Sequence, residues 1–340
     1  MLTRLAILST LFALAKAEAF TSDGTRIIAG YEPKIALSVV GIVLYGLAGT
    51  VHWIHWWRNR NNRFLLTLTI GMTCMVLGFI LRVAYNSALD SIGVYAIMTL
   101  FILLSPCAFL ATNYMLLTRL ARALNAESAL FIRASIVTKL FVWCDVFTFL
   151  LQGAGGGLSS QPTSADLGHK IALVGIAVQL ASYCLFTLLL IYFGFKAPRK
   201  FPQIKEGYRQ HSTAHRDSYS PFATTPLHNW KNLWYLLLIT SVGIIVRSAF
   251  RLAEYTQGYY GYLPTHEGYF YLLDALPLWL AMTLYCFFWP SRFIRGSEEL
   301  IQIENLNLNQ EDVMSMGTPN SGNHELRLKE ISNYRDGHYA

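Results

Sequence analysis

Seven long apolar segments, separated by short polar connections, dominate the sequence. Each segment has about the 20 apolar residues that an α-helix needs to cross a lipid bilayer. They lie at approximately residues 35–57, 64–85, 94–117, 133–152, 170–195, 233–255 and 269–289. This pattern predicts an all-α, polytopic membrane protein with a bundle of seven transmembrane helices over residues 35–295.

The connections alternate in charge, which predicts the side of the membrane on which each one lies. The second, fourth and sixth connections contain no Lys or Arg, whereas the first, third and fifth are basic. Because basic loops stay in the cytoplasm, we expect the N-terminus outside and the C-terminus in the cytoplasm. A basic and then apolar leader over residues 1–17 predicts a signal peptide, followed by an extracellular segment at 18–34.

The composition supports a membrane location and argues against nucleic acid as a partner. The chain is 54% hydrophobic and 14% charged, whereas soluble domains carry about 25% charge. The net charge of +7 lies mainly in the predicted cytoplasmic loops, where it favours correct insertion and contact with anionic membrane lipids. Two polar regions, at about 197–230 and 296–340, are predicted to be disordered and cytoplasmic. We expect the plasma membrane, or alternatively an internal membrane.

Ionisable residues within four of the predicted helices are the main candidates for function. Three arginines and three acids fall between the membrane midplane and its outer surface: Arg82, Asp145, Arg247, Arg251, Glu254 and Asp274. A charge at this depth costs roughly 3 kcal/mol or more unless it pairs or faces water. Arg247, Arg251 and Glu254 share one helix face because they are spaced by four and three residues. We expect Asp145 and Asp274 to pair with these arginines.

The residues alone leave two interpretations of this cluster open. It is either a structural network of ion pairs between helices or a binding site for a polar headgroup. Arginine binds phosphate or carboxylate through two bonds, the acids suit an amine, and Gln152 adds hydrogen bonds. An amphipathic lipid such as a sphingoid base or a sterol-like amine is the candidate ligand, and Arg247, the deepest charge of its helix, is expected to contact it.

A glycine-rich stretch, LQGAGGGLSSQP, follows the fourth apolar segment at its outer end. Four glycines in five positions favour the end of the regular helix. We expect them to allow a close backbone approach or to form a gate over the charged cavity: Gly153, Gly155, Gly156 and Gly157. The stretch lacks the G-x-x-x-x-G-K-[ST] pattern of a phosphate-binding loop, so nothing in it indicates ATP hydrolysis.

Five motifs occur in the order expected of the fungal RTA-like family, lipid-translocating exporters named for resistance to aminocholesterol. They are GFILR, LLSPCAFLATNYMLLTRL, DVFTFLLQGAGGG, VRSAFRLAEYTQG and HEGYFYLLDALP. The chain resembles this family from about Tyr31 to Trp289. The resemblance implies a seven-span protein involved in lipid transport or lipid stress, with site residues at the seven polar positions named above. Many relatives carry an acid seven positions before Arg82, where this sequence has Met75.

Other classes of membrane protein fit the sequence less well. A divergent lipid-sensing receptor or regulator remains the main alternative, although the D/E-R-Y and N-P-x-x-Y motifs of typical seven-span receptors are missing. A retinal protein needs a lysine in the last helix, and residues 269–289 contain none. His52 and His55 provide only two metal ligands and lie among interfacial tryptophans, so we predict no metal, cofactor or catalytic site there.

Overall fold

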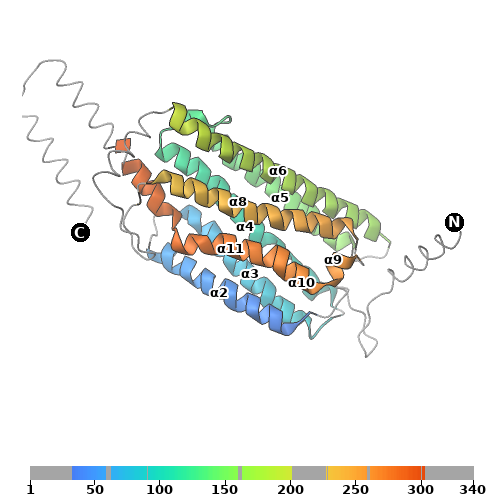
Figure 1. Ribbon diagram of the computed structural model, residues 1–340. Coiled ribbons are helices and arrows are strands. Elements are labelled where there is room, and N and C mark those ends of the chain that lie inside the picture. The colour runs from blue at the N-terminus through green and yellow to red at the C-terminus, as the bar shows by residue number, and fades with distance from the viewer. Residues whose placement is uncertain are drawn as a thin grey trace, which may run out of the picture.

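The computed structural model of the protein describes residues 33–58, 63–89, 91–159, 163–200, 227, 229–258, 261–299 and 301–302. Within these residues, seven helices are long and apolar enough to cross a membrane, which confirms the predicted fold class. They run alongside one another as a single bundle (Figure 1). The predicted signal peptide and most of the predicted extracellular segment, cytoplasmic loop and tail lie outside the described residues.

Several helices, above all α4 and α6, extend further than the apolar segments alone indicate. The first six are α2 (Ile35–Arg58), α3 (Leu66–Tyr85), α4 (Ile92–Ala123), α5 (Ala134–Ser159), α6 (Ala165–Lys200) and α8 (Trp230–Thr256). The seventh span consists of α10 (Glu267–Tyr269), a π-helical turn (Phe270–Ala275) and α11 (Leu276–Phe287), preceded by the short α9 (Tyr262–Thr265). Short 3₁₀ turns, Arg63–Leu65 and Glu127–Ala129, lie in the first and third connections.

The spans form a closed ring of helices in which α4 leans toward the interior. Each helix packs against the next one along the chain, and α11 returns to pack against α2. α4 also contacts α6 and α8, so it crosses the interior of the ring. One continuous apolar core results, with large side chains such as Phe109, Tyr114 and Phe186 fully buried. Many other large apolar side chains remain exposed on the outer faces of the helices, as lipid contact requires.

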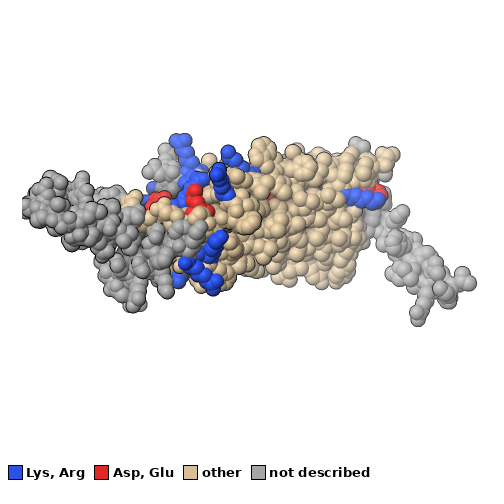
Figure 2. Space-filling view, turned by 90° about the horizontal axis from the view of Figure 1, so that it is seen from above, with Lys and Arg blue, Asp and Glu red and all other residues tan. Residues whose placement is uncertain are grey.

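The two ends of the bundle differ in charge. Lys and Arg side chains gather at the end where α2, α4 and α6 finish (Figure 2). The opposite end is the one that the sequence predicts to face outside, and it is called the outer end here. Its described residues are 85–89, 91–92, 159, 163–165, 256–258 and 261–267. Residues 290–299 and 301–302 are also helical, with Phe293 and Ile301 buried. The predicted disordered tail therefore cannot begin at residue 296; the chain beyond 302 lies outside the described residues.

Candidate functional site

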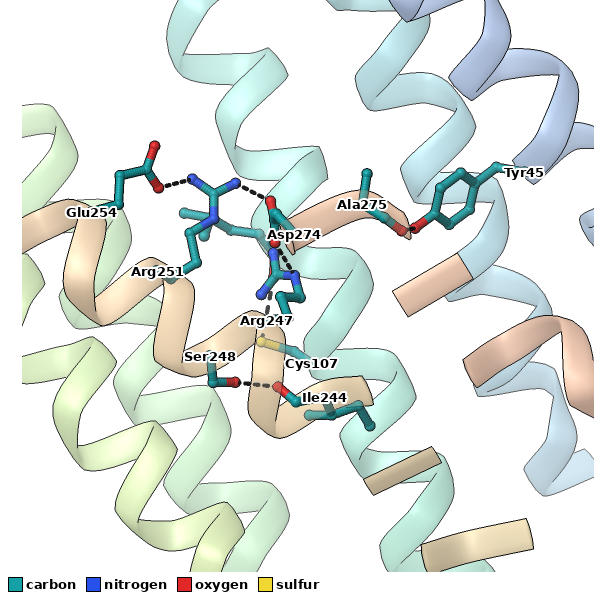
Figure 3. Close-up of polar contacts among 10 residues, drawn as sticks. Tyr45, Cys107, Ile244, Arg247, Ser248, Arg251, Glu254, Asp274 and Ala275 are labelled. Atoms are coloured by element: carbon teal, nitrogen blue, oxygen red, sulfur yellow. Dashed lines mark hydrogen bonds and ion pairs between the residues drawn. The ribbon is translucent and has the colours of Figure 1, made fainter. Parts of the chain in front are cut away.

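Asp274 lies between two arginines of α8, as the sequence predicts. Its Oδ1 is 2.6 Å from Nε of Arg247, and its Oδ2 is 2.6 Å from Nη2 of Arg251 (Figure 3). Nη1 of Arg251 donates to Glu254 at 3.0 Å. The side chain of Asp274 is fully buried, whereas those of Arg251 and Glu254 keep about 15% of their surface exposed. The two arginines on one face of α8 thus share the carboxylate of the seventh span, and Glu254 on the same face pairs with Arg251.

The π-helical turn explains how the seventh span presents Asp274. Pro277 has no backbone N–H, and its ring crowds the carbonyl of Leu273, so the regular α-helical ladder is interrupted here. The chain widens into the π turn Phe270–Ala275 that contains Asp274. The Tyr45 hydroxyl of α2 donates to the carbonyl of Ala275 at 2.7 Å and supports this turn. The short sequence DALP therefore fixes the position of the acid.

A second buried ion pair lies nearer the outer end and contains an acid that the sequence did not single out. Nη2 of Arg82 lies 3.1 Å from Oε1 of Glu267, and both side chains are only 6% exposed. The other carboxylate oxygen of Glu267 accepts from the backbone N–H of Lys34 at 2.9 Å. The sequence pattern places Glu267 in the outer connection before the last apolar segment. It lies seven residues before Asp274, however, and residues with this spacing lie on one face of a helix. That spacing could have revealed it.

A cavity of about 390 Å³ opens beside these ion pairs at the outer end. Its polar wall contains Arg82, Gln152, His169, Arg251, Glu254 and Tyr255. Its apolar wall comes largely from α4, with Ala96, Met98, Leu100, Ile102 and Leu103. The volume lies within the range of about 300–1,000 Å³ that is typical of small-molecule sites. The cavity is therefore large enough for a headgroup and the adjoining part of a hydrocarbon chain.

A small recess of about 10 Å³ continues from Gln152 toward the interior. Nε2 of Gln152 donates to Gln179 at 2.8 Å, and Gln179 contacts the sulfur of Cys107 at 3.6 Å. Arg247 lines this recess rather than the main cavity. Its contact with a ligand stays a prediction. The Nη2 atom of Arg247 is buried and has no hydrogen-bond partner among the residues that the structure describes.

Asp145 does not join the ion pairs, and this part of the sequence-based expectation is wrong. Its side chain is buried at 2% exposure, on α5, and neither carboxylate oxygen has a hydrogen-bond partner among the described residues. The expected partner, Arg251, is taken by Glu254 and Asp274. α8 packs on α6 and α11 and lies apart from α5, which explains the difference. Glu267, and not Asp145, is the third acid of the ion pairs. The three arginines, Arg82, Arg247 and Arg251, therefore pair with Glu254, Glu267 and Asp274.

The glycine-rich stretch remains helical, which also corrects the expectation. α5 continues through all four glycines to Ser159, and α6 packs against this part of α5 at Gly155. A Cβ at Gly155 would lie 2.6 Å from the backbone nitrogen of Ala172 and 2.7 Å from the carbonyl oxygen of Gly168. The expected close approach therefore occurs at Gly155. Gly153, Gly156 and Gly157 line the cavity instead, and a Cβ at Gly156 or Gly157 would meet nothing within 4 Å.

Comparisons with known proteins agree with this arrangement. A sequence model described as "RTA1 like protein" matches residues 68–297. The chain belongs to the RTA1-like family. It is 32% identical to "Protein RTA1" of Saccharomyces cerevisiae over 81% of this chain and 88% of that protein. It is also 30% identical to the yeast "Protoporphyrin uptake protein 1" over 62% and 64% of the two chains, and 24% identical to the yeast "Sphingoid long-chain base transporter RSB1" over 83% and 78%. No solved structure matches the chain.

These names support a membrane transport role for the RTA1-like family, and the described helices make this member a multi-pass membrane protein.

Met75, where many relatives are expected to carry an acid, is fully buried in the apolar core. At the end of the bundle opposite the cavity, the side chains of His52 and His55 are buried. The ring of His55 stacks on that of Trp289, with 4.9 Å between the ring centroids. Within the described residues, no group of three His, Cys, Asp or Glu side chains is arranged to hold a metal.

Proposed function

We propose that this protein transports an amphipathic lipid that bears an amine, with a sphingoid long-chain base as the best candidate. The observation that carries the proposal is the cavity at the outer end, which has a charged wall and an apolar wall facing each other. A headgroup and a hydrocarbon chain need these two surfaces together. The related yeast sphingoid base transporter supports the same class of substrate. In this proposal the charged residues bind the lipid and carry out no catalytic step. We also propose that the protein lies in the plasma membrane.

The charged wall suits a headgroup that has both an amine and hydroxyl groups. Glu254 and Arg251 line the cavity and are its partly exposed ion pair, so a ligand can reach them without breaking a fully buried contact. An ammonium group would replace Arg251 as the partner of Glu254. The released guanidinium and the Gln152 amide would then bind hydroxyl oxygens. Asp274 still holds Arg251 from below, so the arginine keeps its position during this exchange.

The apolar wall gives the hydrocarbon chain a place between α4 and α5. Leu100 and Leu103 of α4 face the cavity together with Gly153, Gly156 and Gly157 of α5. Leu100, Gly156 and Gly157 are also exposed on the surface of the bundle. Side chains in place of the two exposed glycines would narrow this part of the cavity. We infer that the chain of the lipid extends between these helices toward the bilayer.

Reconstituted vesicles test the proposal most simply. Purified protein in phospholipid vesicles should move a fluorescent sphingoid base between leaflets faster than empty vesicles do. Glu254→Gln should slow this movement because it removes the charge that binds the amine while keeping the shape. Glu127→Gln is the matched control, since Glu127 forms an exposed ion pair with Arg122 far from the cavity. Equal rates for wild type and Glu254→Gln would contradict the binding role.

The same vesicles separate transport from lipid sensing. Binding of the sphingoid base without any acceleration of its movement would favour the alternative function, a lipid-sensing receptor or regulator. A sterol-like amine, added as a competitor, tests how strictly the cavity selects the chain. If it slows movement of the sphingoid base in proportion to its concentration, the amine is the feature recognised by the site.

A further inference from the structure

Asp145 is the one acid of the predicted cluster that the ion pairs leave out. Arg82, Arg247 and Arg251 are matched by Glu254, Glu267 and Asp274. No positively charged side chain forms an ion pair with Asp145 in the described part of the chain, and both its oxygens lack hydrogen-bond partners. An ionised carboxylate in such a place would be strongly unfavourable, since buried charges require a partner or water.

The groups that surround Asp145 cannot supply this charge. From α4, the hydroxyl of Tyr114 interacts with the Asp145 carboxyl without forming a hydrogen bond of regular geometry, and the thiol of Cys107 and, from α6, the phenol of Tyr183 lie within electrostatic range of it. All three are neutral in their usual state. On α5 itself, Lys139 is exposed on the surface of the helix and lies six residues away. The surroundings of Asp145 therefore favour the uncharged carboxylic acid.

The position of Asp145 links it to the lipid site. Cys107 lies beside Arg247 (Figure 3) and within electrostatic range of Asp145. Gln179 contacts the Cys107 sulfur and lines the recess beneath the cavity. A short row of polar contacts thus leads from Gln152 in the cavity through Gln179 to Cys107, in the direction of Asp145.

We propose that Asp145 is a proton-binding site which couples the movement of the lipid to the pH difference across the membrane. In the described conformation the carboxyl group holds a proton. Opening of the bundle during transport admits water to the carboxyl group, which then releases its proton to that water as hydronium. Water from the opposite side of the membrane then returns a proton to the carboxylate and restores the neutral acid, so one proton crosses the membrane in each cycle and no other reactant is required.

Infrared spectroscopy tests the proton itself without any lipid substrate. Purified wild-type protein in nanodiscs at neutral pH should show the carbonyl band of a protonated carboxylic acid. The band should shift when the aspartates carry an isotope label in the side-chain carboxyl group, and Asp145→Asn should abolish it. Asp166→Asn should leave it intact, because Asp166 is exposed and paired with Lys170. Absence of a protonated aspartate band in the wild type would overturn the proposal, whether or not the variants fold.

Transport measurements test the coupling, and this part depends on the function proposed above. An imposed pH gradient should change the rate at which wild-type vesicles move a sphingoid base, and reversing the gradient should reverse the effect. In Asp145→Asn the rates under the two gradients should become equal, while binding of the base persists. A gradient response that survives in this variant, or a dependence on sodium instead of pH, would overturn the coupling. If no lipid moves at all, the transport proposal fails, and the infrared result still decides the proton site.

Discussion

Arg82 and Glu267 are 185 positions apart in the chain, yet they form a buried ion pair of 3.1 Å at the outer end of the bundle. The pair joins α3 to the start of the seventh span, and the guanidinium also lies 4.6 Å from the ring centre of Phe270. Glu267 in turn accepts from the backbone of Lys34, just before α2. One carboxylate therefore connects three segments that the sequence separates widely.

Removal of Glu267 should destabilise the protein strongly. Glu267→Ala leaves Arg82 buried without its carboxylate, which costs roughly 3–5 kcal/mol. The expected result is a lower melting temperature and a lower yield of monodisperse protein in detergent. Glu127→Ala is the control because its ion pair with Arg122 is exposed and is worth about 0–1 kcal/mol. Equal melting temperatures for the two variants would contradict the importance of the buried pair.

Asp274→Ala should be rescued in part by a second substitution on α8. The single change removes the acid that holds both Arg247 and Arg251, with a cost of about 3–5 kcal/mol. Adding Arg247→Ala removes the arginine left unpaired, while Arg251 keeps Glu254. The double variant should therefore melt at a higher temperature than Asp274→Ala alone. A double variant that is less stable than the single one would show that Arg247 does not depend on Asp274.

The same substitution at two neighbouring glycines should have opposite effects. Gly155→Ala places a Cβ 2.6 Å from the backbone of α6, so the two helices must separate and stability should fall. Gly157→Ala meets no atom within 4 Å and should stabilise α5 by roughly 0.5–1 kcal/mol, because alanine favours a helix. Thermal unfolding of both variants checks this difference. Similar shifts in one direction would contradict the packing of α5 against α6.

Labelling from outside the cell tests the predicted orientation of the bundle. Cysteines placed in the outer connections by Ser87→Cys, Thr163→Cys and Gln257→Cys should react with an impermeant reagent on intact cells after removal of the wall. Ser128→Cys, in the third connection at the opposite end, should react only after permeabilisation. The five natural cysteines are free thiols within the helices, so a variant without them provides the background. The opposite labelling pattern would show that the bundle has the reverse orientation in the membrane.

The sequence was sufficient for the helices and for the contacts that depend on helical spacing. Arg247, Arg251 and Glu254 share a face because of their periodicity, and Asp274 pairs with the two arginines as expected. The partner of Arg82 was missed because Glu267 begins the seventh span two residues before the apolar segment 269–289, and hydropathy detects only that apolar segment. Asp145 was paired wrongly because the order of helices around the ring, which separates α5 from α8, is a property of packing.

Photo-cross-linking tests the central claim, that the cavity binds an amine-bearing lipid, most directly. A sphingoid base with a photoreactive group near its head should label the α4 segment 96–103 and the facing glycines of α5 in the purified protein. An excess of unlabelled base should abolish the labelling, and Glu254→Gln should reduce it. Labelling confined to outward-facing side chains such as Leu188 or Val242, without competition by unlabelled base, would contradict the claim.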